Sequence, residues 1–407
     1  MRRFALLLLL CAAALLQACA TAENAEPVRL TVWVGDNQDQ PWLEQAVQRF
    51  KDAHPDTSYE IQPGVVGEGD AKSTVLTDVE AAADVFTFAD DQFNDLVNAR
   101  VLQAVENPEE IIAENGGEDS AAVQAASSGG TLYAYPATAD NGYFMFYNTQ
   151  YFSESDVQTL DAMLDKAAQS GKYVGFPLSN GWYLYSFFKG AGLTLSLDED
   201  GVTNRCNWNA TDTPITGVQV VEALRAIASH PGFRDADSDP FVAGLKDGSI
   251  IAGVSGVWNA NAAAEVWGEH YAAAKLPTYT VAGRQAQMGS FAGFKMIGVS
   301  SYSAHVGDAM DLAAFLTSYD SQLLRFRLRS QGPSNVRAAE SAEVQANPAI
   351  AALAAQAAYA DVQRVGDNYW SAAATLGKIL AKGESESADA QALLDTAAAG
   401  ITAAPTK

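Results

Sequence analysis

Cysteine and histidine are scarce in this chain, and their scarcity excludes several kinds of chemistry. There are 3 Cys and 4 His in 407 residues. Cys11 and Cys19 belong to the leader region at the N-terminus, which leaves Cys206 without a partner for an internal disulfide. No two His stand at the helical spacing of a metal site, and neither a G-x-S-x-G motif nor a phosphate-binding P-loop occurs. We therefore expect neither a metal nor another cofactor.

Basic residues are also few. Lys and Arg number 25 against 49 Asp and Glu, which gives a formal net charge of −24 at pH 7. A surface of this sign repels nucleic acid and anionic lipid, so we expect no nucleic-acid partner. The hydrophobic content of 48% argues against disorder. We expect a folded monomer whose acidity keeps it in solution.

Long apolar runs are absent beyond the N-terminus. The run at residues 4–16 follows two Arg and is too short to span a bilayer, which takes about 20 residues. It ends in Leu16-Gln-Ala-Cys19, which resembles the lipobox of bacterial lipoproteins, where the Cys becomes the lipidated N-terminus. The resemblance implies a signal peptide over 1–18, a lipidated tether over 19–27, and a location on the extracytoplasmic face of the cell membrane. The alternative is an ordinary secretory signal cut near residue 20, which discards Cys19.

Alternating strand and helix patterns predict an α/β protein. Residues 30–34, 41–53 and 59–62 have the patterns of a strand, a helix and a strand, which predicts a parallel sheet with a right-handed crossover. The length exceeds what one hydrophobic core usually serves, so we expect two lobes, with 137–141 as the first passage between them. The chain beyond about residue 338 is rich in Ala and is expected to be helical. Further strands are expected at 84–88, 132–136, 142–147, 250–254 and 294–299, and further helices at 70–83, 91–99, 216–229 and 308–319.

Polar and aromatic side chains follow several of these strands. Ligands of open parallel sheets bind beyond the carboxyl ends of the strands. Carboxylate and amide oxygens accept hydrogen bonds from sugar hydroxyls, and flat rings cover the apolar faces of a sugar. The combination predicts a sugar-binding site, although most of the aromatic residues must belong to the core. The relevant stretches are Gly35-Asp-Asn37, Phe88-Ala-Asp-Asp-Gln92, Asn180-Gly-Trp-Tyr-Leu-Tyr185, Ser255-Gly-Val-Trp-Asn259 and Asp367-Asn-Tyr-Trp370.

The same stretches resemble the maltose-binding-protein-like family of extracellular solute-binding proteins. The resemblance implies a periplasmic-binding-protein-like fold, in which two α/β lobes are joined by hinge segments around a ligand cleft. It also implies capture of maltose or a malto-oligosaccharide by hinge closure, with delivery to an ABC permease and its cytoplasmic ATPase. It places the N-lobe at 28–138 plus 281–331 and the C-lobe at 142–279 plus 335–407. The likeness runs in order through 30–36, 83–93, 132–136, 146–148, 253–258, 275–278 and 369–370.

Site residues are carried over from this family by position. Asp36 and Asp91 match hydroxyl-binding carboxylates, and Trp258 and Trp370 match stacking rings. Trp182 stands where the family has a Tyr, and Phe88 where it has a Trp. Asn37, Gln92 and Asn180 replace a Lys, an Arg and a Glu, while Asp140 or Asn141 falls near another Glu. The expected ligand-binding set is Asp36, Asn37, Phe88, Asp91, Gln92, Asp140, Asn141, Asn180, Trp182, Trp258, Tyr369 and Trp370.

The same residues are compatible with other functions. The residues at which this chain differs from the family make the site less charged, so xylo-, galacto- or fructo-oligosaccharides are alternatives to malto-oligosaccharides. A surface glycoside hydrolase needs two carboxylates about 5–9.5 Å apart, and any chain with 49 acidic residues offers such pairs. A structural or adhesive lipoprotein is a third class, but it has no need of amide- and aromatic-rich loops.

A calcium-binding loop is an alternative interpretation of one acidic stretch. Residues 235–239 have the acidic spacing of such a loop, but Pro240 and Lys246 stand where it needs Gly and Glu. We therefore expect a solvated turn that caps the next helix.

Overall fold

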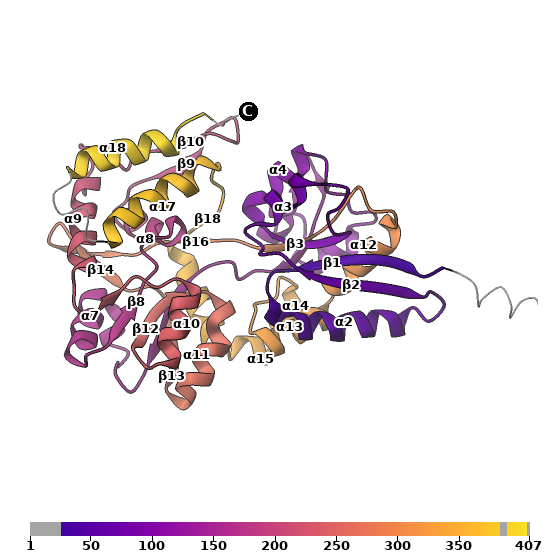
Figure 1. Cartoon of the computed structure of the whole chain (residues 1–407), viewed down its shortest axis with the longest axis horizontal. Coiled ribbons are helices and arrows are strands. Elements are labelled where there is room, and N and C mark those ends of the chain that lie inside the picture. Colours follow the sequence, from indigo (N-terminus) through magenta and orange to yellow (C-terminus); the bar gives the residue numbers. More distant parts are fainter. Residues whose placement is uncertain (1–25, 383–388, 405–407) are drawn as a thin grey trace, which may run out of the picture.

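Two five-stranded sheets, one in each of two lobes, organise the structure (Figure 1). The computed structural model describes residues 26–382 and 389–404. The N-lobe sheet consists, in spatial order, of β2 (Tyr59–Val65), β1 (Val28–Val34), β3 (Val85–Ala89), β17 (Lys295–Val299) and β6 (Tyr135–Thr138). The C-lobe sheet consists of β11 (Phe233–Arg234), β8 (Tyr173–Gly175), β12 (Ile250–Ser255), β7 (Phe144–Asn148) and β13 (Tyr271–Ala274).

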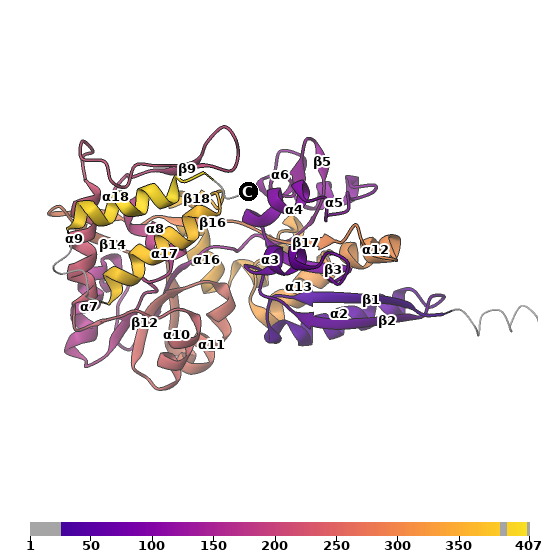
Figure 2. The same ribbon diagram turned by 45° about the horizontal axis from the view of Figure 1, so that its top comes forward.

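Helices cover the N-lobe sheet on both faces. The first long helix begins with a Pro in its first turn and buries Leu43, Ala46 and Phe50, which recur at helical spacing, against the sheet. Figures 1 and 2 show α3 and α4 on the side of the sheet away from this helix. The helices of this lobe are α2 (Gln40–Ala53), α3 (Ala71–Thr77), α4 (Phe93–Asn98), α5 (Glu109–Glu114), α6 (Ala121–Ala125), α12 (Val306–Leu316) and α13 (Tyr319–Arg329).

The C-lobe sheet lies between two hydrophobic cores. Alternate residues of β7 enter opposite cores: Met145 and Tyr147 join one cluster, whereas Phe144 and Phe146 join the other. This is why the strand reads as an unbroken apolar run. The helices of this lobe are α7 (Leu160–Gln169), α8 (Gly181–Gly190), α9 (Gly217–Ala228), α10 (Ser238–Lys246), α11 (Ala260–Trp267), α16 (Pro348–Gln356), α17 (Asn368–Ala381) and α18 (Ala390–Ile401).

Small elements complete both lobes and the connections between them. Helices α14 and α15 pack against α13, because Ala338 and Val344 share a cluster with Leu323 and Phe326. The chain passes between the lobes after β6, before β17 and after α13. The small elements are β4 (Ser127–Ser128), β5 (Thr131–Leu132), β9 (Leu195–Leu197), β10 (Asn204–Cys206), β14 (Thr278–Val281), β15 (Arg284–Gln287), β16 (Ser290–Ala292), β18 (Ala360–Val362), α14 (Val336–Ala339) and α15 (Ala342–Gln345).

The structure corrects several of the expected elements. The β1-α2-β2 unit is parallel as predicted, but β17 and β6 are antiparallel to their neighbours, so the N-lobe sheet is mixed. The chain returns from the C-lobe just before β17, and β17 therefore runs through the sheet in the direction opposite to β3. The helix predicted at 70–83 ends at Thr77, and that at 308–319 is α12, which begins at Val306 and ends at Leu316 before a second helix starts at Tyr319. The strand predicted at 132–136 is divided between β5 and β6.

The predicted signal peptide and lipid anchor lie outside the described residues. Cys19, the signal peptide over 1–18 and most of the tether fall in residues 1–25, which the structure does not describe. Within the described ranges, no helix is long and apolar enough to cross a membrane.

Candidate binding cleft

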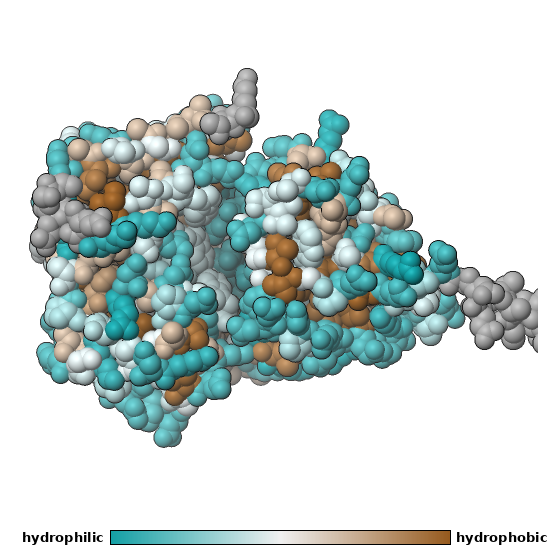
Figure 3. All heavy atoms as spheres, in the orientation of Figure 1, coloured by the Kyte–Doolittle hydropathy of each residue, from teal (hydrophilic) through white to brown (hydrophobic). Residues whose placement is uncertain are grey.

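A cleft of ≈ 400 Å³ lies between the two lobes. Figure 3 shows the groove that separates them on the face in view. N-lobe and C-lobe residues line the cleft together, so a change in the angle between the lobes would open or close it. The lining residues are Asp36, Glu68, Gly69, Ala89, Asp91, Asn141, Trp182, Trp258, Lys295, Gln363 and Trp370.

The C-lobe supplies an aromatic wall, defined here as Trp182, Trp258 and Trp370. The rings of Trp182 and Trp258 have centroids 5.8 Å apart at an interplanar angle of 33°. All three indoles are half-buried, so each keeps a face toward the cleft. The ring of Trp258 lies so close over Gly256 that a Cβ there would come within 2.0 Å of it. Glycine at this position therefore makes room for the ring.

Core aromatic residues hold the rings of this wall. Tyr143 packs edge-on against Trp182 at 4.6 Å and donates a hydrogen bond to its backbone carbonyl at 2.9 Å. Trp370 contacts Tyr369 and Phe291 at 5.0 and 6.0 Å between centroids. Since these supports are fully buried, the wall is anchored in the C-lobe core.

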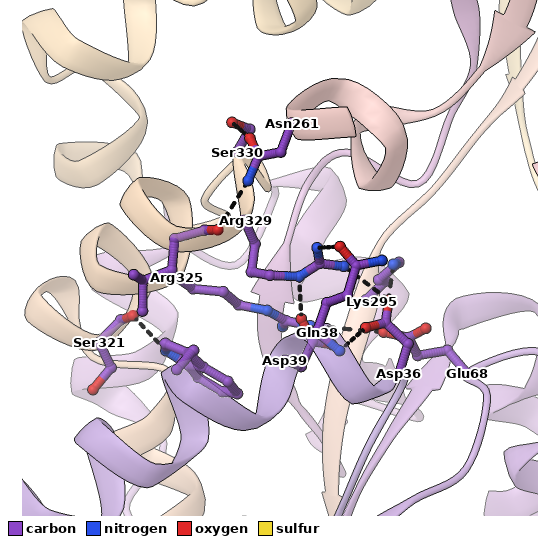
Figure 4. Close-up of polar contacts among 12 residues, drawn as sticks. Asp36, Gln38, Asp39, Glu68, Asn261, Lys295, Ser321, Arg325, Arg329 and Ser330 are labelled. Atoms are coloured by element: carbon purple, nitrogen blue, oxygen red, sulfur yellow. Dashed lines mark hydrogen bonds and ion pairs between the residues drawn. The ribbon is translucent and has the colours of Figure 1, made fainter. Parts of the chain in front are cut away.

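The N-lobe supplies a wall backed by buried ions (Figure 4). The ion network consists of three acids, Asp36, Asp39 and Glu68, and three bases, Lys295, Arg325 and Arg329, so its formal charges balance. Arg329 donates hydrogen bonds of 2.8 Å to both Asp36 and Asp39. Glu68 lies 3.4 Å from the ammonium of Lys295 and 3.6 Å from the guanidinium of Arg325.

Burial and charge act against each other within this network. Burial alone would raise the pKa of Asp39, but the charges of Arg325, Arg329 and Lys295 outweigh it and hold that pKa below its usual range. The carboxylate is therefore ionised at neutral pH. The side chain of Glu68 occupies the space beside Gly35, where a Cβ would come within 2.1 Å of the carboxyl group. Thus a glycine makes room for one cleft-lining side chain on each wall.

Asp91 differs from the other carboxylates of the cleft because it has no cation at ion-pair distance in the described structure. Burial raises its pKa to about 6, although a hydrogen bond from Gln363 acts in the opposite direction. Its Oδ1 atom is buried and has no hydrogen-bond partner. Gln363 also accepts a 2.8 Å hydrogen bond from the indole N–H of Trp182, so one amide connects the two walls.

Six of the predicted residues line the cleft, and the other six lie elsewhere. The six in the cleft are Asp36, Asp91, Asn141, Trp182, Trp258 and Trp370. Phe88 and Tyr369 have no exposed surface and belong to the hydrophobic cores, because their side chains point to the inner face of β3 and α17. Asn37 is exposed outside the cleft.

The remaining three position their neighbours. Gln92 donates to the carbonyl of Glu68 at 2.6 Å and accepts from the backbone N–H of Lys72. Asn180 caps α8 by accepting from the backbone N–H of Trp182 at 3.0 Å. Asp140 is buried and accepts from the backbone N–H of Gly332, next to a crossing between the lobes.

Sequence reasoning missed Glu68, Lys295 and Gln363. Glu68 follows the carboxyl end of β2, so the strand-end rule selects it, but the glycines on either side of it are equally typical of a turn. Lys295 begins β17, which runs antiparallel and pairs Lys295 with Ala89 at the same edge. The first residue of a strand can thus face the cleft only in a mixed sheet. Gln363 lies in a loop without any sequence signal.

Direct contacts join the lobes on either side of the cleft. Lys72 of α3 bonds Asp367 at the start of α17 at 2.8 Å, and also Asp95 of α4 at 2.8 Å. Ser330 donates to the side chain of Asn261 in α11 at 2.6 Å.

The acidic loop at 235–239 makes protein contacts instead of presenting open ligands. Asp235 accepts from the backbone N–H of Ser179 at 3.0 Å, and Asp237 caps α10 and accepts from Asn180. No group of three or more His, Cys, Asp or Glu in the described part of the chain is arranged to hold a metal ion.

The family model of bacterial extracellular solute-binding proteins matches residues 45–352. The chain belongs to this family. No curated protein sequence matches this solute-binding protein. Its two-lobed α/β fold is that of periplasmic-binding-protein-like relatives.

Solved structures agree with the family assignment. One, solved with acarbose, is 32% identical and superimposes with a TM-score of 0.81 over 93% of this chain and 99% of its own. The maltodextrin-binding protein from L. casei BL23 is 23% identical, with a TM-score of 0.75 over 93% and 100% of the two chains. The maltotriose-binding protein of Thermus thermophilus is 17% identical, with a TM-score of 0.77 over 92% and 99%. At these lower identities the likeness is one of fold.

Proposed function

We propose that this solute-binding protein captures a gluco-oligosaccharide of the maltodextrin type and delivers it to an ABC importer. The observation that carries the proposal is the pairing of walls. Trp182 and Trp258 present neighbouring rings at 5.8 Å, opposite hydrogen-bonding groups of the N-lobe, across a ≈ 400 Å³ cleft. A sugar has apolar ring faces and a rim of hydroxyls, and this cleft offers a surface for each.

The related structures support the same class of ligand. The 32% identical relative was solved with acarbose, and two others are named for maltodextrin and maltotriose. Xylo-, galacto- and fructo-oligosaccharides remain alternatives, since they offer the same groups in other arrangements. Hinge closure follows from the wall arrangement, because a ligand that touches both walls binds the closed form better. The partners are then the permease and its cytoplasmic ATPase.

A calorimetric screen tests the proposal. We expect maltotriose and acarbose to bind, and xylotriose, galacto- and fructo-oligosaccharides to bind at least tenfold more weakly, which corresponds to about 1.4 kcal/mol. Tighter binding of any of the latter would replace the maltodextrin assignment. Incubation with maltotriose should release no glucose, because the family and the structural neighbours are binding proteins; glucose release would favour the hydrolase.

The lipid anchor is the second part of the proposal. The motif at Leu16–Cys19 supports lipidation of Cys19 and attachment to the extracytoplasmic face of the cell membrane. Several acyl chains on one residue anchor a protein stably, whereas a single chain is marginal. Cys19→Ala should move the protein from the membrane fraction to the soluble fraction. Continued membrane retention of the variant would exclude this anchor.

A further inference from the structure

A second cavity, named here the hinge cavity, lies against the segments that connect the two lobes. It has a volume of ≈ 240 Å³, and all three connections contribute to its lining, at 139–142, 290–293 and 332–333. The rest of the lining comes from α14, α15, α16 and the residues that follow α16. Figure 1 shows α14 and α15 at the boundary between the lobes. Asn141 lines both cavities, so the connection at 139–142 separates the hinge cavity from the cleft.

The hinge cavity exists because its lining residues are small. Nine of them are Ala or Gly. A Cβ at Gly142 would come within 2.9 Å of Leu353, and one at Gly332 within 3.0 Å of Ile350. Helix α16 therefore packs directly on the backbone of the first and third connections, and the Ala residues leave the remaining space unfilled. A molecule that fills such a space gains the dispersion contacts that the lining lacks.

The lining offers few free hydrogen-bonding groups. Gln356 accepts from the backbone N–H of Leu276 at 2.9 Å and donates to the carbonyl of Met288 at 3.3 Å. Asp140 accepts from the backbone N–H of Gly332, and its Oδ1 atom has no accessible surface and so does not face the cavity. Every polar side chain of the lining has a partner in the protein: Asp140, Asn141, Ser290, Gln345 and Gln356.

Size and lining together define the chemistry of an occupant. Phe291, Ile350 and Leu353 supply apolar surface, and the exposed residues Ala354 and Ala357 place the mouth of the cavity at the protein surface. A cavity of about 150 Å³ with such a lining binds benzene, so ≈ 240 Å³ holds a molecule of about ten heavy atoms. A charged or polyhydroxylated molecule would lose its hydration here without finding partners. The lining thus selects an uncharged apolar molecule.

The position of the cavity links its occupancy to the cleft. The connections form the wall between the two spaces, so a rotation of the lobes that narrows the cleft widens the hinge cavity. An occupant that needs this room binds the closed form better, and so does a sugar that touches both walls of the cleft. Two ligands that favour the same form strengthen each other's binding by the same factor.

We propose that the hinge cavity is a second binding site, which takes one small uncharged apolar molecule and thereby strengthens sugar binding in the cleft. The binding of the apolar molecule is independent of the proposed function. Its effect on sugar affinity rests on that function.

Calorimetry with toluene tests the site itself. We expect the wild-type protein to bind one toluene with a dissociation constant of about 1 mM or below. Ala354→Trp adds an indole at the mouth of the cavity and should weaken this binding at least tenfold. Ala355→Trp is the matched control, because Ala355 is exposed on the same helix but does not line the cavity.

A second pair of variants guards against an indole that turns away from the cavity. Ala357 and Ala358 are both exposed, and only Ala357 lines the cavity, so Ala357→Trp should weaken toluene binding and Ala358→Trp should not. If wild type binds no toluene, or if the two members of each pair bind it alike, the hinge cavity is not a site.

Titration of maltotriose in saturating toluene tests the link to the cleft. We expect toluene to tighten maltotriose binding by about fivefold, and maltotriose to tighten toluene binding by the same factor. If maltotriose displaces toluene, the hydrocarbon lies in the cleft and the inference fails. An unchanged affinity for maltotriose would refute the link between the sites. If maltotriose does not bind at all, the proposed function fails, while the toluene titrations, which need no sugar, still decide whether the cavity binds.

Discussion

The N-lobe wall of the cleft is built on buried ions, whereas the C-lobe wall is built on packed aromatic rings. Arg325 and Arg329 are each 2% exposed and hold the acids of the N-lobe wall in place. The indoles of the C-lobe wall rest on rings that belong to the hydrophobic core. The ions depend on one another, so loss of one should unfold its surroundings. A half-buried ring contributes less to the fold, so its loss should act mainly on ligand binding.

The largest expected effect is on the ion network. Arg329→Met removes one of the two cations paired with Asp39, which is 1% exposed, and leaves a buried carboxylate short of a cation. Breaking a buried ion pair from one side costs about 3–5 kcal/mol. We expect a loss of this size in the free energy of unfolding, measured by urea denaturation. Arg327→Met is the control on the same helix, because its partner Glu343 is at the surface and its loss should not measurably change stability.

A loss below about 1 kcal/mol for Arg329→Met would contradict the comparison between the walls. It would mean that Lys295 and Arg325 alone can satisfy Asp39. The ions of the network would then not depend on one another for stability.

The next effect depends on pH and concerns Asp91, the acid of the cleft that lacks a cation. Its pKa is about 6 in the folded protein and near 3.9 in the unfolded chain. Between these values the folded state binds more protons, so the free energy of unfolding falls as pH rises from about 4 to about 6. The shift sets an upper limit of about 3 kcal/mol. Asp91→Asn lacks this term, so urea denaturation should show the variant gaining stability relative to wild type across that window.

Asp156 is a control, because its pKa is shifted in the opposite direction to that of Asp91. Hydrogen bonds from Lys166 and Ser153 lower its pKa to about 2. Its ionised form therefore stabilises the fold above about pH 4, and this contribution is lost as pH falls through about 2. Asp156→Asn should lose stability relative to wild type at neutral pH. A relative gain for Asp156→Asn, or a pH-independent difference for Asp91→Asn, would refute the assignment of these charges.

Substitutions in the aromatic wall should reduce ligand affinity more than they reduce the free energy of unfolding. Trp258→Ala removes one of two neighbouring rings, and burying such a side chain against a ligand contributes about 1–3 kcal/mol. We expect calorimetric affinity for maltotriose to fall about 5- to 150-fold, with Trp370→Ala behaving alike. Tyr302→Ala, at a residue 49% exposed on the N-lobe, is the control and should bind normally. Unchanged affinity in both Trp variants would remove the wall from the site.

The two walls also differ in how far the sequence predicts them. Trp182 and Trp258 stand next to Gly181 and Asn259, Trp370 stands two residues after Asn368, and all three rings line the cleft. The ion network is harder to foresee, because Arg325 and Arg329 come from a helix almost 300 residues from Asp36 in sequence. Charged residues on a helix normally indicate a solvated face. Only the tertiary arrangement buries these two.

The positions of single strands explain the other differences from prediction. The β-α-β start is evident from local periodicity, so β1, α2 and β2 were placed correctly. Phe88 was expected in the cleft, but successive residues of a strand face opposite sides, and this one faces the core. β17 joins the sheet from the other direction after a passage through the second lobe. The return to the N-lobe was expected, but local pattern carries no information about the direction in which β17 runs, so Lys295 was missed.

The smallest expected effect is at an ion pair that joins the two lobes beside the cleft. Lys72 bonds Asp367 across the lobes, but the side chain of Asp367 is 68% exposed, and such pairs contribute about 0.2–1 kcal/mol. Lys72→Met should therefore weaken calorimetric binding of maltotriose by at most about fivefold, since only closure loses a contact. Lys166→Met removes a pair with Asp156 within the C-lobe and should leave affinity unchanged. Added salt should narrow the gap between wild type and Lys72→Met, because screening weakens the same contact. A gap that is absent at low salt would show that the lobes close without this ion pair.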